Sequence, residues 1–285
     1  ATAKTSDNVT HTDGTLSFAS VDSGGTASTT ICSVNSTSGL VAFVKEGTCY
    51  IKASYTASGG YTAATATINF TITAVTPTVT ITLAPSGSVA ASYAFNAMPS
   101  LAATVPGGGA ITWSVDATTS SNCSITSGGV TSATAAGGAS CKINATSAAV
   151  NGYNAGSGSV TFTITTVTRT LSAITGQGSG ATAYNKKGYA SATATFTLSP
   201  AASGGTVTIT SSNGTNCNLK QVSDGTTTYT SSSSTNISMT AYTTSTQTIT
   251  WANVNTAGAT CTITVSVGAV TGYSTPSNAT LSITL

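Results

Sequence analysis

The chain has 285 residues, a net charge of +2 and only 5% charged residues, against roughly a quarter in an ordinary soluble domain. Nucleic-acid binding requires a cluster of Lys or Arg that neutralises phosphates, and no such cluster exists, so we expect no nucleic-acid partner. No apolar run reaches the roughly 18 residues of a transmembrane helix, so we expect no membrane-spanning segment. Ser and Thr fill 104 positions, yet apolar residues make up 39%, which favours folded modules over disorder.

A motif of a cysteine, an isoleucine and a Gly-Tyr pair occurs three times with constant internal spacing. In each copy the isoleucine follows the cysteine by 2 positions and the tyrosine follows it by 12. The copies begin at Cys49, Cys141 and Cys261. A fixed pattern at a domain-sized period indicates tandem modules. We therefore expect three domains, joined by short links in a semi-rigid row, at residues 1–75, 76–167 and 168–285.

Runs with one apolar face and one threonine face follow one another along the chain. Threonine suits the outer face because its branched side chain fits the pleated backbone while its hydroxyl meets water. In chain order the clearest runs are 67–72, 78–83, 159–164, 192–198, 206–210 and 280–285. Glycine-rich turns separate these runs, and no convincing helix is present. This pattern predicts an all-β protein of three tandem Ig-like antiparallel β-sandwiches.

Each predicted module contains two of the six cysteines. We expect one disulfide in each module, with free buried thiols as the alternative. The expected pairs are Cys32 with Cys49, Cys123 with Cys141, and Cys217 with Cys261. Such pairing implies an oxidising, extracellular environment.

The third module is longer than the others, and we place a Ser/Thr-rich insertion in it near residues 223–248. Its most polar tract, residues 226–235, has a single apolar residue, Tyr229. We expect this tract to be exposed and to be the best candidate for O-linked sugar. The candidate acceptors are Thr226, Thr227, Thr228, Thr230 and Ser231.

The segment from Ser33 through Gly47-Thr-Cys49-Tyr-Ile51 to Gly60-Tyr-Thr-Ala resembles the bacterial immunoglobulin-like (Big-type) repeats of large surface proteins. The second module keeps Cys141-Lys-Ile and Gly152-Tyr-Asn-Ala, whereas the third has Ser-Thr-Pro after its Gly272-Tyr pair. The resemblance implies an Ig-like fold and a cell-surface setting. Such repeats serve as stalks, spacers and fibre modules, so the resemblance alone fixes no function.

Residues for catalysis are scarce. His11 is the single histidine, and no G-x-S-x-G motif accompanies it. Asp7, His11 and Asp13 form the one possible metal-ligand group, but the chain has neither an EF-hand run nor a C-x-x-C pair. We therefore expect no enzyme, no catalytic residues, no metal and no cofactor.

Large apolar residues near the disulfides allow two interpretations. Phe18, Trp113 and Ile209 each precede the first cysteine of a module, and sugar stacking is one possible role. We favour a core position beside the disulfide, as in immunoglobulin-type sandwiches. We likewise expect the repeated tyrosines to be structural corners and not ligand platforms. They are Tyr61, Tyr153 and Tyr273.

The first module is short at its beginning. It has 17 residues before Phe18, whereas 37 separate Thr76 from Trp113 and 41 separate Thr168 from Ile209. About twenty residues, enough for one or two strands of five to six residues, are missing, so we expect an open sheet edge. A strand from a neighbouring chain would close it, with Ala1, Thr2, Ala3, Lys4 and Thr5 as the candidate donor. The alternative is a missing strand that lies upstream in a longer polypeptide.

These patterns together predict a non-enzymatic extracellular structural protein that forms a cell-surface fibre with copies of itself. The low charge of the chain weakens self-repulsion and favours such association. The alternative is a carbohydrate- or receptor-binding adhesin module, or a stalk segment of a larger surface protein, with glycans or a host surface as partner.

Overall fold

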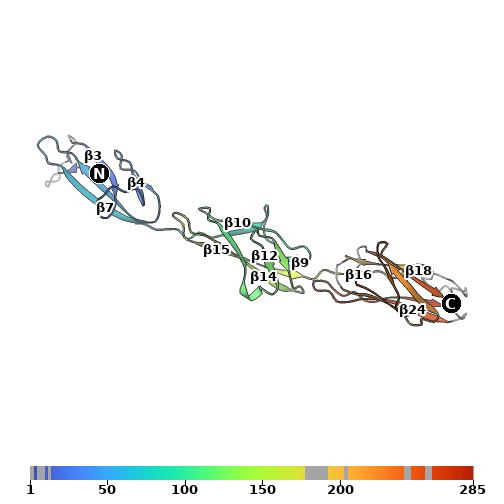
Figure 1. Cartoon of the computed structure of the whole chain (residues 1–285). Helices are drawn as coiled ribbons and strands as arrows, with labels where there is room; N and C mark the ends of the chain where they lie inside the picture. Colours follow the sequence, from blue (N-terminus) through green and yellow to red (C-terminus); the bar gives the residue numbers. More distant parts are fainter. Residues whose placement is uncertain are drawn as a thin grey trace.

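The computed structural model describes residues 3–4, 10–11, 14–176, 192–201, 205–240, 245–253 and 259–284. Figure 1 shows three β-rich modules arranged end to end, with the N terminus in the first module and the C terminus in the third. The only helical element in these ranges is a short 3-10 turn, η1 (Ala117–Thr119). The predicted all-β fold of three tandem Ig-like sandwiches is confirmed.

The first module is built on a three-stranded antiparallel sheet in the order β3-β6-β7. Two small hairpins accompany it, β4 with β5 and β1 with β2. The strands are β1 (Ala3–Lys4), β2 (Thr10–His11), β3 (Leu16–Val21), β4 (Cys32–Val34), β5 (Val41–Phe43), β6 (Gly47–Tyr55) and β7 (Ala64–Ile72).

The second module has the corresponding sheet with one strand more, in the order β11-β14-β15-β9. Two pairs, β8 with β10 and β12 with β13, complete it. The strands are β8 (Thr80–Leu83), β9 (Ser92–Ala94), β10 (Leu101–Thr104), β11 (Ile111–Val115), β12 (Cys123–Ile125), β13 (Thr131–Ala133), β14 (Ala139–Ser147) and β15 (Gly156–Thr165).

In the third module two sheets enclose the core. One runs β16-β18-β23-β20-β21, with β17 also beside β18, and the other runs β22-β19-β24-β25. The strands are β16 (Thr170–Leu171), β17 (Thr175–Gly176), β18 (Ala192–Ser199), β19 (Val207–Ser211), β20 (Cys217–Ser223), β21 (Thr228–Thr230), β22 (Asn236–Met239), β23 (Thr246–Asn253), β24 (Thr260–Val267) and β25 (Ala279–Thr284).

The alternation of apolar and polar residues in the sequence places them on opposite faces of each strand. In β18, Ala192, Ala194, Phe196 and Leu198 are buried. The threonines between them point outward, and β24 and β25 repeat this pattern. Burial of the apolar face is what drives such strands to pair and pack.

The disulfides join the expected cysteines, one pair in each module. The Cα–Cα distances are 5.7 Å for Cys32–Cys49, 5.9 Å for Cys123–Cys141 and 6.3 Å for Cys217–Cys261. Each bridge ties the central strand of a sheet to a strand of the facing layer, which shortens the loops that the unfolded chain can explore.

Two features differ from the expected plan. The sandwiches are not wholly antiparallel, because β9 runs parallel to the end of β15. The expected insertion near 223–248 is only partly superficial, because β22 and the start of β23 lie in this range. Ile237, Met239 and Gln247 are buried there, at 2%, 0% and 1% exposure. The extra length of the third module therefore contributes strands to its core.

Candidate assembly site

The outer edge of β7 in the first module has no partner strand among the described residues. Matched by their pairing with the disulfide cysteine of the central strand, Phe70 of β7 corresponds to Phe162 of β15. In the second module β9 covers this edge: the Thr163 amide donates to the Ala91 carbonyl (2.9 Å), and the Phe95 amide donates to the Thr165 carbonyl (3.0 Å). No counterpart of β9 lies on β7 in the described part of the first module.

The missing strand also leaves a gap in the side-chain packing. Tyr93 of β9 packs edge-to-face on Phe162, with ring centroids 5.1 Å apart, and Phe162 is 2% exposed. The corresponding Phe70 is half-buried and meets Phe43 instead, at 6.2 Å. Phe43 itself is 69% exposed. Among the described residues of the first module, no ring covers Phe70 as Tyr93 covers Phe162.

Exposed large apolar side chains concentrate in the first module and in the linker that follows it. Among the described residues they are Leu40, Phe43, Val44, Tyr61, Ile68 and Val75. The second and third modules have one such described residue, Val130. The core is correspondingly thin, with only Cys32, Cys49 and Ile51 fully buried in its cluster. An apolar surface of this kind marks a contact site or an aggregation hazard.

Nothing in the sequence of β7 protects the edge. Edge strands usually carry a lysine, a proline or a bulge that prevents pairing with another chain. β7 is 9 residues long, reads ATATINFTI and contains none of these residue types. It pairs with β6 in an unbroken register from Ala64 to Ile72. A long and regular free edge is the preferred template for strand addition.

The expected donor segment begins at Ala1. Ala3 and Lys4 form β1, which pairs with His11 and Thr10 of β2 and not with β7. Ala1, Thr2 and Thr5 lie outside the described residues, as do Asp7 and Asp13 of the possible metal group. Of this segment the structure describes only Ala3 and Lys4, and the strand pairing that they make is with β2.

The two joints between modules share one pattern of backbone hydrogen bonds, which the sequence did not predict. The Val75 amide donates to the Gly152 carbonyl (3.0 Å), and the Asn154 amide donates to the Val75 carbonyl (2.9 Å). At the next joint Val167 pairs in the same way, with Gly272 at 2.8 Å and Ser274 at 2.9 Å. The repeated Gly-Tyr motif thus receives the end of the preceding module.

Side chains reinforce each joint differently. At the first joint Gly152 also donates to Glu46 Oε2 (3.3 Å). Hydrogen bonds from its own backbone amide and from Gly152 lower the pKa of Glu46. At the second joint Phe95 packs edge-to-face on Tyr273, with centroids 6.0 Å apart. The expected role of these tyrosines as structural corners is therefore incomplete, because their turns also hold the modules together.

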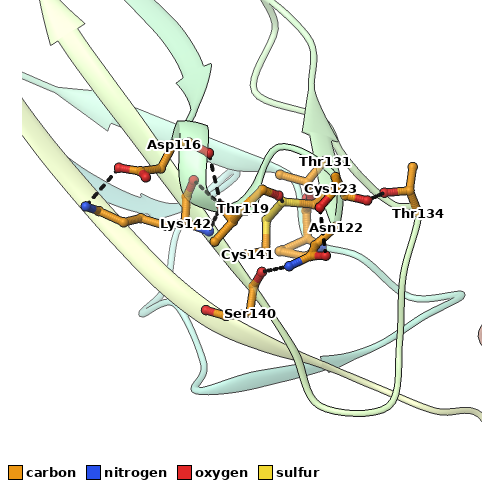
Figure 2. The surroundings of a disulfide bond; sticks show 11 residues. Asp116, Thr119, Asn122, Cys123, Thr131, Thr134, Ser140, Cys141 and Lys142 are labelled. Carbon is orange, nitrogen blue, oxygen red and sulfur yellow. Dashed lines mark hydrogen bonds and ion pairs between the residues drawn. A yellow bond between two sulfur atoms is a disulfide. The ribbon is translucent and has the colours of Figure 1, made fainter.

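The disulfide of the second module lies in a dense polar network that Figure 2 shows in close view. Beside Cys123 and Cys141, the Lys142 amide donates to Thr119 Oγ1 (3.0 Å), and Asn122 Nδ2 donates to the Ser140 carbonyl (2.9 Å). These bonds fix the turn around η1 to the central strand.

Asp116 and Lys142 form an ion pair of 2.9 Å at one side of this network. The hydroxyl of Thr118 donates to the Asp116 carboxylate (2.7 Å), and its amide does so at 3.1 Å. These bonds, with the Lys142 ammonium and the Asn144 amide, hold the pKa of Asp116 well below its usual value. Both side chains of this pair are partly exposed, and their ion pair supports the local structure. No second carboxylate acts on Asp116 among the described residues.

The polar tract of the third module lies at its surface. Thr226, Thr227, Thr228 and Thr230 are exposed, and Ser231 is half-buried. The turn before it is held by the Asp224 carboxylate, which accepts from the amides of Thr226 (2.8 Å) and Thr227 (2.6 Å). Tyr229, the apolar residue of the tract, packs against the core. These four threonines of the tract are exposed to solvent, whereas the Ser231 hydroxyl donates to the Asn236 carbonyl (2.8 Å).

Potential metal ligands are scattered among the described residues. No group of three or more potential metal ligands occurs there. A hollow of about 240 Å³ lies beside the first disulfide, and Asp22 and Tyr50 are in its lining. The Asp22 carboxylate accepts from the amides of Gly24 and Thr26, both at 2.9 Å, and so holds its own turn. In the part of the chain that the structure describes, no helix is long and apolar enough to cross a membrane.

The residues proposed as core anchors lie inside the modules. Ile209 is fully buried, and Phe18 and Trp113 pack against the core clusters of their modules. The fold and joints together define a tandem Ig-like β-sandwich protein.

No protein-family model matches this chain, and no curated protein matches it. The Big-type resemblance therefore extends to the Ig-like fold and no further.

Among solved structures, domains 1–6 of the surface layer protein SbsC are similar, with 15% identity over 99% of this chain and a TM-score of 0.38. The chain spans 37% of that solved structure. Cadherin-like domains 1 to 4 of zebrafish RET give 11% identity over 96% of this chain and 66% of theirs, with a TM-score of 0.31. Drosophila N-cadherin EC1-4 gives 12% identity over 100% of this chain and 69% of its own, with a TM-score of 0.25. At these scores the neighbours assign no function to this chain.

Proposed function

We propose that this chain is a non-enzymatic extracellular structural protein that forms a cell-surface fibre by strand addition between neighbouring copies. The observation that carries the proposal is the 9-residue edge of β7, which is unpaired among the described residues. This strand carries the exposed Ile68, and its Phe70 contacts the exposed Phe43. An added strand would satisfy the backbone groups of this edge and cover these two rings at once.

Strand addition leads to a polymer when acceptor and donor belong to different surfaces of the same chain. Such a heterologous contact generates an open filament when the rotation between successive copies does not close into a ring. Association is further favoured by the low surface charge, since only 5% of residues are charged. Copies of the chain are therefore the principal proposed partner.

The proposed location is the cell surface. Three disulfides form and persist in an oxidising environment, which supports a location outside the cytosol. The exposed threonines of the 226–231 tract are proposed acceptors for O-linked sugar, which would add a hydrated layer to a fibre whose surface carries few charges.

The segment Ala1–Thr5 remains a proposed donor strand. For this segment to be donated, the two-residue pairing of Ala3 and Lys4 with β2 has to open, or β2 has to move together with the segment. This requirement is modest because an isolated two-stranded hairpin is marginally stable in water. Donor and acceptor would then both lie in the first module.

The joints support a second candidate, a stalk segment of a larger surface protein. Two backbone hydrogen bonds at each module boundary make the row semi-rigid, as a spacer requires. The proposed boundaries at 75/76 and 167/168 fall at the clamped valines Val75 and Val167. A stalk would need no contact between copies, and this difference separates the two candidates.

The test compares the self-association of two charge variants. Ile68→Lys places a charge at the free edge, at a side chain that is 64% exposed, so it leaves the isolated module folded. Val130→Lys is the matched control, since Val130 is 49% exposed in the second module. Sedimentation velocity should show polymers for the unmodified chain and for Val130→Lys, and monomers for Ile68→Lys. Equal association of all three, or no association of any, contradicts the proposal.

A further inference from the structure

The turn that receives the linker in the second module contains an Asn-Gly pair. It runs from Val150 to Tyr153, and the Tyr153 amide donates to the Val150 carbonyl at 2.8 Å. Its two central residues are Asn151 and Gly152. In such a pair the backbone nitrogen of the glycine can attack the side-chain carbonyl carbon of the asparagine, because glycine has no Cβ that hinders the approach. The first joint therefore holds a nucleophile and an electrophile next to each other.

Both reacting groups of this pair are accessible. Asn151 is exposed, and its side chain makes no hydrogen bond among the described residues. The space above Gly152 is open, because a Cβ added there would meet no atom within 4 Å beyond its chain neighbours. The Gly152 amide donates an exposed hydrogen bond of 3.3 Å to Glu46 Oε2. The side chain of Asn151 can therefore turn toward the nitrogen without displacing a packed neighbour.

The chain has one other Asn-Gly pair, Asn213 and Gly214, and the fold protects it. Asn213 Oδ1 accepts from the amides of Thr215 and Asn216, both at 3.1 Å. A Cβ added to Gly214 would lie 2.4 Å from Ser234 Oγ, so the backbone here is packed against the segment before β22. The side chain of Asn213 cannot turn toward the glycine nitrogen until both of its hydrogen bonds have broken.

We propose that Asn151 is a site of spontaneous deamidation, an irreversible modification that alters the first joint. The Gly152 nitrogen gives up its proton to the solvent and forms a bond to Cγ of Asn151. The bond from Cγ to Nδ2 breaks, and the nitrogen takes up a proton and leaves as ammonia. Water then adds to one of the two carbonyl carbons of the cyclic imide and breaks the bond of that carbon to the ring nitrogen. The products are aspartate and isoaspartate, and this inference does not depend on the proposed fibre.

The isoaspartate product changes the main chain at the point where the joint is formed. Its main chain runs through the former side chain and is longer by one methylene group just before Gly152. The Gly152 carbonyl accepts from the Val75 amide (3.0 Å), and the Val150 amide donates to the Tyr153 carbonyl (3.1 Å). Both products also add a negative charge to a turn that already holds the Glu46 carboxylate. The longer, more negative turn holds the linker less firmly, and the joint loosens.

The second joint lacks this reaction. Its turn has Thr271 and Gly272 at the two central positions. Threonine has no side-chain carbonyl, so it cannot form the cyclic imide. The two joints make the same backbone hydrogen bonds, so Asn151→Thr gives the first turn the residue that the second turn already uses. The modification therefore changes one joint of the row and leaves the other as it was.

The experiment incubates the folded full chain at mildly alkaline pH and measures aspartate and isoaspartate at both Asn-Gly pairs by peptide mass spectrometry. Asn151 should convert roughly 10-fold or more faster than Asn213, because two hydrogen bonds have to break first at Asn213. In the reduced and denatured chain the two pairs should convert at similar rates, since the fold then protects neither. Equal rates in the folded chain would overturn this inference, as would an Asn151 that reacts only after unfolding.

Amide hydrogen exchange tests the effect on the joint. The Asn154 amide donates to the Val75 carbonyl (2.9 Å), and the Ser274 amide donates to the Val167 carbonyl (2.9 Å). After incubation, exchange at Asn154 should accelerate in the unmodified sequence and stay unchanged in Asn151→Thr. Exchange at Ser274 should stay unchanged in both. Unaltered exchange at Asn154 in a chain whose Asn151 has been converted would refute the effect on the joint.

Discussion

The amide of Val75 donates a hydrogen bond of 3.0 Å to the carbonyl of Gly152, and this bond crosses the boundary between the first and second modules. A residue that is 59% exposed is thus fixed through its backbone and not through burial of its side chain. Substitution by proline removes the only group that makes this bond, because proline has no amide hydrogen. The hydrogen bond across this joint therefore depends on an atom that most substitutions preserve.

We expect Val75→Pro to loosen the first joint while Val75→Ala leaves it intact. The measurement is amide hydrogen exchange at Asn154, whose amide donates to the Val75 carbonyl at 2.9 Å. Exchange there should accelerate in the proline variant only, with the exchange of β14 unchanged. Equal protection of the Asn154 amide in both variants would show that the clamp does not depend on the Val75 amide.

The acid sensitivity of the second module should depend on Asp116. Its pKa is lowered in the folded state, chiefly by the Thr118 hydroxyl and then by Lys142. Because the folded pKa is the lower one, the ionised carboxylate stabilises the fold above the unfolded pKa of about 3.9, and this contribution is lost as the pH falls below it. The difference in β14 exchange between the unmodified chain and Asp116→Asn should be present at neutral pH and shrink in acid. A difference that grows below pH 4 would contradict this assignment of the pKa shift.

The disulfides should be found within modules and nowhere else. Non-reducing peptide mapping is expected to recover three links, 32–49, 123–141 and 217–261. Replacing both Cys123 and Cys141 with alanine should cost the second module about 3 kcal/mol, the value for a loop of this length. Any link between two modules would refute the arrangement.

In the third module, substitutions in the core strands should lower the free energy of unfolding more than substitutions in the surface tract. Met239 in β22 is fully buried, so Met239→Ala should lower the free energy of unfolding by about 2–5 kcal/mol. Thr230 in β21 is exposed, so Thr230→Ala should change it by no more than about 0.5 kcal/mol. Chemical denaturation followed by the fluorescence of the buried Trp251 measures both. Similar losses in the two variants would mean that the tract carries part of the core.

The strands and the disulfide frame could be predicted because their signals repeat in the sequence. Period-2 alternation marked β18 and β25, and two cysteines per repeat marked the bridges. The open edge of the first module was expected from the short spacing before Phe18, and its exposed Ile68 and half-buried Phe70 are what such an opening leaves.

Other features lacked a signal in the side chains. The joints at Val75 and Val167 are made by backbone groups, which every residue except proline provides. The parallel strand β9 is only 3 residues long, too short for a periodic pattern. The core strand β22 has only two apolar residues, Ile237 and Met239, and lies next to a Ser/Thr tract, so composition alone placed it in an insertion.

The central claim, that the edge of β7 is covered by a strand from another copy, is tested most directly by hydrogen exchange along Ala64–Ile72 as a function of concentration. In a dilute solution of monomers, the β7 amides that point away from β6 should exchange quickly, because no strand accepts from them in the described structure. In the assembled state the same amides should become protected, while β15, whose edge β9 already covers in part, should change little. Amides of β7 that are equally protected in the monomer, or that remain unprotected in the assembly, would contradict assembly through this edge.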